Sequence, residues 1–332
     1  MGDLWTAKLS PVDRVGIALL GLWFVWVTAS SIGHGSNFTD ALPYLTAPTF
    51  AVLGVIAGNW AQARGIPSWF TAFLLALAIY VLISVTVMGG AGGGPLGYAN
   101  ANAALGIQLT AVAAITALHT VGQTRTWALW AMGLCAVSVP FTLSQAGIAL
   151  LLALLPALVL ALTRPRKQRG WAVPLSMLVV TAAAGAVAYS ARMQEWPSAL
   201  LKALSGARQE LWSDAVSVWA RNPISGGGPG SFATYSSIAD DPDTERVHMS
   251  LLQVGSELGM IGLAIFGVVI LLAFIKLAMA PPAPRLIAAT GLAALLIHSF
   301  VDHLFEFPAI TLASGLMLGL AGFSRLWSQK SE

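Results

Sequence analysis

Apolar residues in this chain gather into ten long runs that are separated by short polar stretches. A helix of about 20 mostly apolar residues is long enough to cross a membrane, so the pattern predicts ten spanning helices. They cover residues 13–31, 41–58, 68–88, 99–119, 125–143, 145–163, 171–190, 249–277, 284–304 and 307–324. Only Leu143-Ser144-Gln145 separates the fifth run from the sixth, which predicts a tight hairpin. The fold class is therefore an all-α polytopic membrane protein.

The composition agrees with this pattern. Of the 332 residues, 57% are hydrophobic and 9% are charged, whereas a soluble domain carries roughly 25% charged residues. The net charge of +3 does not indicate nucleic-acid binding, because the basic residues fall where membrane topology places them. The single cysteine, Cys135, excludes an intramolecular disulfide and a cysteine metal cluster. We expect the first apolar run to be a retained helix rather than a cleaved signal peptide.

Lysine and arginine positions predict the topology, because cytoplasmic loops of membrane proteins are rich in both. With a cytoplasmic N-terminus, the inner segments hold twelve of the seventeen: Lys8, Arg14, Arg64, Arg125, Arg164, Arg166, Lys167, Arg169, Lys276, Arg285, Arg325 and Lys330. The short outer loops 32–40, 89–98, 143–145 and 303–308 hold none. The remaining five lie in one long outer segment: Arg192, Lys202, Arg208, Arg221 and Arg246. Both termini are therefore expected in the cytoplasm.

This topology divides the chain into three parts. Residues 1–190 form a bundle of seven helices, residues 191–248 form the outer segment, and residues 249–332 form a bundle of three helices. In the outer segment, apolar residues recur at helical spacing from Ser198 to Ala220. They predict an amphipathic helix along the outer membrane surface, where tryptophans such as Trp212 and Trp219 are typical.

A glycine-rich turn, Gly226 to Gly230, follows this helix. Glycines let backbone N–H groups converge on an anion such as a phosphate, which would place Gly226, Gly228 and Gly230 in a substrate loop. A flexible turn after a helix explains the same residues. The turn is not a Walker motif, because no Gly-Lys-Ser/Thr follows it.

Basic residues supply the candidates for catalysis. Arginine binds phosphate in a bidentate manner and stays charged. Arg208 lies within a helix that has an apolar face, where a solvated arginine is hard to explain, while Arg246 and Arg221 are further candidates. His248 lies at the start of a helix, where the helix dipole favours the neutral imidazole that a general base requires. A histidine solvated by lipid headgroups is the alternative interpretation.

Ionisable residues also mark the outer end of the ninth run, at His298, Asp302, His303 and Glu306. His298 and Asp302 are one helical turn apart. Ionisable groups near the membrane are candidates for function, but a pair that braces helix ends explains them as well. Glu257 is expected on the opposite side of its helix from His248, as a packing brace.

A metal site is not predicted. Clustered carboxylates at Asp240-Asp241-Pro242-Asp243 could hold a divalent cation, yet a solvated acidic turn explains them equally. No histidine or cysteine spacing typical of zinc is present. The sequence indicates no metal and no cofactor.

Several motifs follow one another in and around the outer segment. The first runs from Arg208 to Leu211-Trp212-Ser213-Asp214-Ala215, the second from Asn222-Pro223 through Gly226, Gly228 and Gly230 to Phe232, and the third from His248 through Gln253 to Glu257-Leu258-Gly259. Gly97-Tyr98-Ala99-Asn100 precedes them and His298-Ser299-Phe300-Val301-Asp302 follows them. Over roughly residues 90–320, this order and spacing resemble the O-antigen ligase/polymerase family.

The resemblance implies a metal-independent membrane glycosyltransferase of the C type, a GT-C-like fold. Members take a glycan from an undecaprenyl-diphosphate carrier in the lipid bilayer and pass it to a hydroxyl of a glycan or lipid-glycan acceptor. They act on the outer face of the bacterial cytoplasmic membrane, and no nucleic acid takes part. His248 matches the proposed base of the family, and Arg208 matches the arginine proposed to bind diphosphate. Asn100 and Trp212 are expected near the substrate, with Asp302, His298 and Glu257 in support.

One position departs from the family pattern. Many members have Ser-Arg-Gly at the start of a middle helix, and that arginine also serves the diphosphate. Here the matching stretch is Ser144-Gln145-Ala146-Gly147. Glutamine donates hydrogen bonds but brings no charge. Arg246 or Arg221 could compensate, or the donor or the activity could differ.

Two other hypotheses stay open, a transporter or flippase of lipid-linked glycans and an inactive relative that acts as a binding partner. Transporters usually place ionisable groups near the bilayer midplane. The charges of this chain cluster at helix ends and in one loop, which favours chemistry at the membrane surface.

Overall fold

The protein is described by a computed structural model that covers residues 11–88, 93–164, 170–193, 195–236, 238 and 244–322. Within these residues it contains helices and no strand. The long helices are α1 (Pro11–His34), α2 (Phe38–Ala63), α3 (Ser68–Val87), α4 (Ala99–His119), α5 (Gly122–Phe141), α6 (Gln145–Thr163), α7 (Ala172–Ser190), α11 (Ser250–Ala278), α12 (Pro282–Ser299) and α13 (Pro308–Gly322). Short helices are α8 (Ser198–Leu204), α9 (Gly206–Arg221), α10 (Ser231–Tyr235) and the 3-10 helix η2 (Leu304–Glu306).

Each of the ten predicted runs corresponds to one long helix, so the chain is an all-helical, multi-pass membrane protein. Seven helices are long and apolar enough to cross a membrane by length and composition: α1, α2, α3, α4, α6, α7 and α11. The other three long helices do not meet this criterion of length and composition: α5, α12 and the shorter α13. The count of ten spanning helices therefore stays a prediction.

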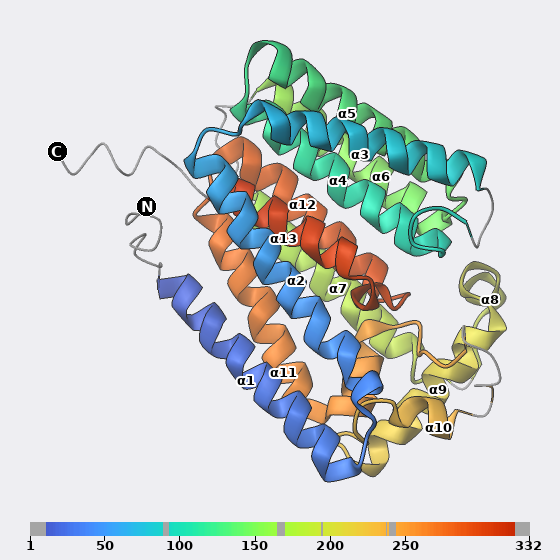
Figure 1. Ribbon diagram of the computed structural model, residues 1–332. Helices are drawn as coiled ribbons and strands as arrows, with labels where there is room; N and C mark the ends of the chain where they lie inside the picture. Colours follow the sequence, from blue (N-terminus) through green and yellow to red (C-terminus); the bar gives the residue numbers. More distant parts are fainter. Residues whose placement is uncertain are drawn as a thin grey trace.

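Helix α4 occupies the centre of the bundle and is buried along nearly its whole length. It contacts α5, α6, α12 and α13. Figure 1 shows α3 to α6 grouped on one side of the molecule, and α1, α2 and α11 grouped on the other. Helices α2 and α13 pack closely where Gly54 and Gly58 face Gly315 and Gly319, because a Cβ atom at any of these positions would meet the backbone of the other helix.

The outer segment folds against one end of this bundle (Figure 1). The single helix predicted from Ser198 to Ala220 is wrong in one respect, because it is two helices, α8 and α9. They are separated at Ser205, whose φ of 75° lies in the left-handed region that a continuous right-handed helix cannot contain. Serine gives no compositional sign of such a break.

The apolar face of α9 is covered by protein. Leu211, Trp212 and Ala215 pack in one cluster with Phe232 of α10 and Met249 at the start of α11. The helix is amphipathic as predicted, but these residues do not face lipid. Its apolar face therefore anchors the outer segment to α11.

The loops predicted to be outer lie together at this end of the bundle, since side chains from 98–100, 144 and 302 are hydrogen-bonded to one another. Which side of the membrane this end faces stays a prediction. Several residues used in the sequence argument lie outside the described residues: Lys8, part of the loop 89–98, Arg166, Lys167, Arg169, Asp240, Asp241, Asp243, Arg325 and Lys330.

Candidate active site

Asp302 is the centre of a buried polar network. The predicted helix 284–304 ends early, at Ser299, so Asp302 lies in the turn that follows α12 rather than one helical turn from His298. Its side chain is completely buried. Oδ1 lies 2.9 Å from Nδ1 of His303 and 3.3 Å from Nδ1 of His248, and it accepts the backbone N–H of His303 at 2.8 Å.

These contacts determine which nitrogen of His248 can act as a base. A carboxylate only accepts hydrogen bonds, so the Nδ1 that faces Asp302 carries the ring proton and Nε2 carries the lone pair. The backbone of His248 has a φ of 51°, in a region that non-glycine residues rarely adopt. Such conformations are found at functional sites, where the surrounding structure holds them.

The second carboxylate oxygen of Asp302 has its own partners. Oδ2 accepts the hydroxyl of Tyr98 at 2.8 Å and the side-chain amide of Asn100 at 2.5 Å. The guanidinium of Arg208 lies 3.4 Å from the same oxygen, and one fifth of that side chain is exposed. The predicted base, the predicted diphosphate arginine and Asn100 therefore meet on one buried carboxylate.

The first turns of three helices reach this network. Asn100 is the second residue of α4, and its Oδ1 accepts the hydroxyl of Ser144 at 2.5 Å. Ser144 is the N-cap of α6, where its side chain accepts the backbone N–H of Gly147. Ser250 begins α11 and donates its hydroxyl to the backbone carbonyl of Asp302 at 3.2 Å. Helix N-termini carry partial positive charge, so this region favours an anion.

The charges in the network shift the pKa values of its members. Burial would raise the pKa of Asp302, but hydrogen bonds from His248 and His303 outweigh burial and hold that pKa well below its ordinary value. Burial, and then the nearby carboxylate of Asp302, raise the pKa of Tyr98. Asp302 is therefore an anion, and Tyr98 is a neutral hydrogen-bond donor.

A second network is centred on Glu257, which is 1% exposed. Its carboxylate accepts the hydroxyl of Tyr44 at 2.7 Å, the amide of Gln253 at 2.7 Å and the backbone N–H of Gly230 at 3.0 Å. The carbonyl oxygen of the Gln253 side chain accepts the backbone N–H of Val247 at 2.9 Å. Glu257 thus braces the backbone beside His248 through Gln253.

Arg246 lies beside this second network. Its guanidinium is 3.1 Å from the carboxylate of Glu306. Burial would lower the pKa of Arg246, but the negative charges of Glu306 and Glu257 outweigh it and raise that pKa. Arg246 therefore stays charged close to His248, although its nearest partner is a carboxylate of the chain.

The glycine-rich turn is fixed on a break in α11. Gly259, with φ 65° and ψ −166°, interrupts that helix and exposes its backbone groups. The N–H groups of Gly227 and Gly228 donate to the carbonyls of Ser256 and Glu257 at 2.8 and 2.9 Å. In return, the N–H of Met260 donates to the carbonyl of Pro223 at 3.0 Å.

These bonds bear on the two interpretations of the turn. The N–H groups of Gly226, Gly227, Gly228 and Gly230 are all bonded within the chain. The turn is therefore docked on α11 and does not present an open set of N–H groups. The predicted role of Gly226, Gly228 and Gly230 in a substrate loop stays a prediction.

Three other candidates lie apart from the network or inside the core. Arg221, at the far end of α9 from Arg208, stacks over the ring of Tyr235 at 4.6 Å. Trp212 is completely buried against Trp196, with ring centres 5.0 Å apart. Both ring nitrogens of the buried His298 lack a hydrogen-bond partner among the described residues. Among the described residues, Arg208 is the predicted arginine that contacts Asp302.

Gln145 is the first residue of α6 and is exposed. It follows Ser144, which is bonded to Asn100 and so belongs to the network of Asp302. The side chain that replaces the expected arginine therefore stands at the edge of the site.

Sequence reasoning assigned no role to two tyrosines of these networks, since Tyr98 contacts Asp302 and Tyr44 contacts Glu257. It named His303 among the ionisable residues near the membrane but did not predict its contact with Asp302. Together, His248, Asp302 and His303 form a group that could hold a metal ion. The spacing of residues along the sequence does not indicate this group, because His248 lies 54 positions from Asp302.

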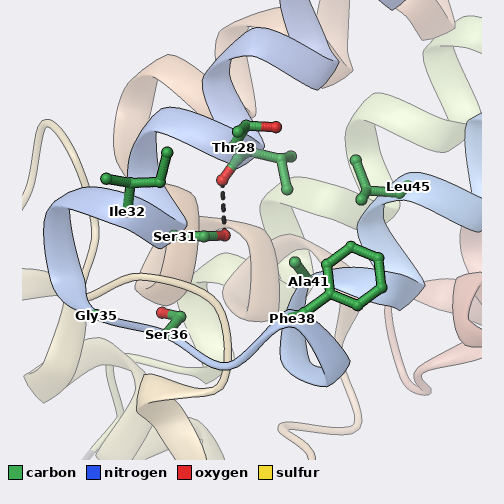
Figure 2. A pocket seen from close by; sticks show the side chains of 9 residues that line it. Thr28, Ser31, Ile32, Gly35, Ser36, Phe38, Ala41 and Leu45 are labelled. Atoms are coloured by element: carbon green, nitrogen blue, oxygen red, sulfur yellow. Dashed lines mark hydrogen bonds between the residues drawn. The ribbon is translucent and has the colours of Figure 1, made fainter.

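A separate groove lies between α1 and α2 and has a volume of about 340 Å³. Figure 2 shows its lining, which is mostly apolar and includes Ile32, Phe38 and Leu45, with hydroxyl groups from Thr28 and Ser31. None of the predicted site residues lines it. The groove is therefore not part of the Asp302 network.

Residues 127–267 match the protein-family model described as O-antigen ligase. This part of the chain is similar to the O-antigen ligase family, which supports the resemblance found in the sequence motifs. The matched part contains Gln145, Arg208 and His248, whereas Tyr98 and Asp302 lie outside it and are brought in by the fold. A search of curated proteins gives no significant match. Together with the apolar helices, the match supports a membrane protein related to the enzymes of polysaccharide biosynthesis.

Proposed function

We propose that this protein is a member of the O-antigen ligase family and transfers a glycan from an undecaprenyl-diphosphate carrier to a sugar hydroxyl of a glycan or lipid-glycan acceptor. The reaction would take place on the outer face of the bacterial cytoplasmic membrane, with both termini of the chain in the cytoplasm. One observation carries the proposal. His248 and Arg208 meet on opposite oxygens of the buried Asp302 carboxylate, which supplies a base and an anion-binding cation at one place.

In the proposed step, His248 is the general base. The acceptor hydroxyl gives its proton to Nε2 of His248 while its oxygen forms a bond to the anomeric carbon of the donor. Nδ1–H of the same ring points to Asp302 at 3.3 Å, so the carboxylate stabilises the imidazolium that forms. Asp302 orients the base and itself stays ionised.

The bond from the anomeric carbon to the diphosphate breaks in the same step, and its electron pair leaves with the diphosphate. This single displacement inverts the anomeric configuration. One guanidinium nitrogen of Arg208 faces Asp302, and arginine has five N–H donors, so others can bind diphosphate oxygens. Fixed positive charge is needed where negative charge develops, and the N-termini of α4, α6 and α11 add to it. The proposed step uses no metal ion.

The test is glycan transfer by the purified protein in proteoliposomes that contain a polyprenyl-diphosphate oligosaccharide. A second molecule of that lipid as acceptor tests for a polymerase, and a lipid-glycan acceptor tests for a ligase. We expect His248→Ala and Arg208→Ala to lose transfer. His34→Ala and Arg192→Ala, which change exposed residues outside both networks, are expected to retain it.

Transfer by both H248A and R208A at the wild-type rate would exclude the proposal. A chelator is added to a parallel wild-type reaction. Loss of transfer with the chelator, restored by one added divalent ion, would exclude the metal-independent step while leaving the donor and acceptor in place.

A further inference from the structure

Three ligand atoms from the candidate site lie unusually close together. Nδ1 of His248 is 3.3 Å from Oδ1 of Asp302, Nδ1 of His303 is 2.9 Å from the same oxygen, and the two Nδ1 atoms are 3.3 Å apart. Around a tetrahedral zinc ion with bonds of about 2.0–2.1 Å, neighbouring ligand atoms lie about 3.3–3.4 Å apart. The three atoms therefore nearly match one face of such a coordination shell.

Hydrogen bonds alone do not make all three of these contacts favourable. A neutral imidazole carries one ring proton. If both rings donate to Oδ1 of Asp302, the N–H groups of His248 and His303 converge on one oxygen with their nitrogens only 3.3 Å apart. If one ring carries its proton on Nε2 instead, its Nδ1 lone pair faces a carboxylate oxygen. A cation between the three atoms would meet a lone pair from each of them.

The surroundings support a metal ligand set. Tyr98 and Asn100 donate to Oδ2 of Asp302 and so fix the orientation of the carboxylate, as outer-shell partners of metal ligands do. The side chains of His248 and His303 are 10% and 12% exposed, which leaves access from solvent. Arg208, 3.4 Å from Oδ2, is the charged group that opposes a cation.

We propose that His248, Asp302 and His303 bind a divalent transition-metal ion of the zinc class, and that this ion inhibits the enzyme. Two imidazoles and one carboxylate suit zinc-like ions better than Mg²⁺ or Ca²⁺, which prefer oxygen ligands. The inhibitory part rests on the proposed function. A metal on Nδ1 of His248 takes that lone pair, so the single ring proton moves to Nε2. Nε2 then cannot accept the proton of the acceptor hydroxyl.

Co²⁺ tests the metal site without reference to activity. Chelator-treated, tag-free protein in detergent is titrated with CoCl₂ while the visible absorption is recorded. We expect one bound equivalent with the d–d absorption of a four-coordinate site, which ZnCl₂ removes by displacement. His303→Ala and His303→Asn are expected to weaken binding by about 100-fold or more. His34→Ala controls for exposed histidines, and Arg208→Ala is expected to bind more tightly.

Thermal unfolding establishes that each variant is folded before it is titrated. Absence of a saturable Co²⁺ signal in the wild type, or an unchanged signal in both folded His303 variants, overturns the site. Inhibition of transfer by ZnCl₂ that a chelator relieves supports the inhibitory role. Undiminished transfer with Zn²⁺ bound overturns that role alone. A protein that binds Co²⁺ but transfers no glycan to either acceptor overturns the proposed function and leaves the metal site standing.

Discussion

Replacement of Asp302 by asparagine tests how much the buried carboxylate contributes to transfer. Asparagine has the same shape, so the network of six donors around residue 302 is disturbed by charge and not by size. The amide offers one oxygen, so it can accept from the side of His248 and His303 or from the side of Tyr98 and Asn100. On the other side, its NH₂ group faces N–H and O–H donors.

The size of the effect follows from the contact to His248. In the proposed transition state the imidazole becomes an imidazolium, and Asp302 accepts its Nδ1–H. A hydrogen bond to a charged group contributes about 1.5–3 kcal/mol. Since about 1.4 kcal/mol changes a rate tenfold, D302N is expected to lower kcat by about 10- to 150-fold. The effect on KM for the acceptor should be smaller, because the charge develops in the transition state.

The assay is glycan transfer in proteoliposomes at saturating donor, with kcat expressed per folded protein from thermal unfolding. Asp214→Asn on α9 is the matched control, because that carboxylate accepts the hydroxyl of Ser236 at 3.2 Å outside the Asp302 network. We expect its kcat to stay within about twofold of the wild type. If D302N folds and turns over as fast as D214N, then Asp302 does not stabilise the imidazolium and the assignment of the base is wrong.

Three further predictions concern the turn, the missing arginine and pH. Gly259→Ala should destabilise the protein by more than about 3 kcal/mol, because the added Cβ would meet the backbone of Ile224 and φ at this position is 65°. Gly267→Ala in the same helix adds a Cβ in open space and should shift Tm little. Equal shifts in Tm for the two variants would contradict the docked turn. Gln145→Arg should lower KM for the donor about tenfold by adding a charge-assisted hydrogen bond, and an unchanged KM would place residue 145 outside the diphosphate site. Because the pKa of Asp302 is lowered in the folded state, its stabilisation is present above about pH 4 and is lost as pH falls below that value. The difference in Tm between wild type and D302N should therefore not shrink as pH falls from about 8 to about 5, and a difference that shrinks within that range would refute the lowered pKa.

The hydrophobic pattern was sufficient to predict the long helices, because each apolar run is bounded by polar residues, glycine or proline. Every run became one helix, with the largest displacements at the ends of α2, which continues to Ala63, and of α12, which stops at Ser299. The pattern failed at Ser205, where the chain takes a φ of 75°. Side-chain composition did not indicate that break, since it depends on how α8 and α9 pack on the rest of the molecule.

The candidate site was only partly predictable. Arg208, His248, Asn100 and Asp302 could be found from motifs, and the structure brings them into contact. Tyr98 could not be assigned, because its hydroxyl meets a residue 204 positions away. A sequence motif shows which residues are neighbours along the chain, whereas the hydrogen-bond partners of a buried carboxylate are the residues that lie near it in the folded structure.

The comparison at Gln145 illustrates the same limit of sequence motifs. Judged by side chains, the change from arginine to glutamine removes one full positive charge from the proposed diphosphate site. A comparison of side chains leaves out the partial charges of the backbone at helix termini. A helix N-terminus carries roughly half a positive charge, and α4, α6 and α11 all begin within the hydrogen-bonded network of Asp302. These termini and Arg208 retain a positive field whatever residue stands at position 145. The substitution should therefore alter donor affinity more than it alters the proton transfer at His248, and the KM and kcat of Gln145→Arg separate the two effects.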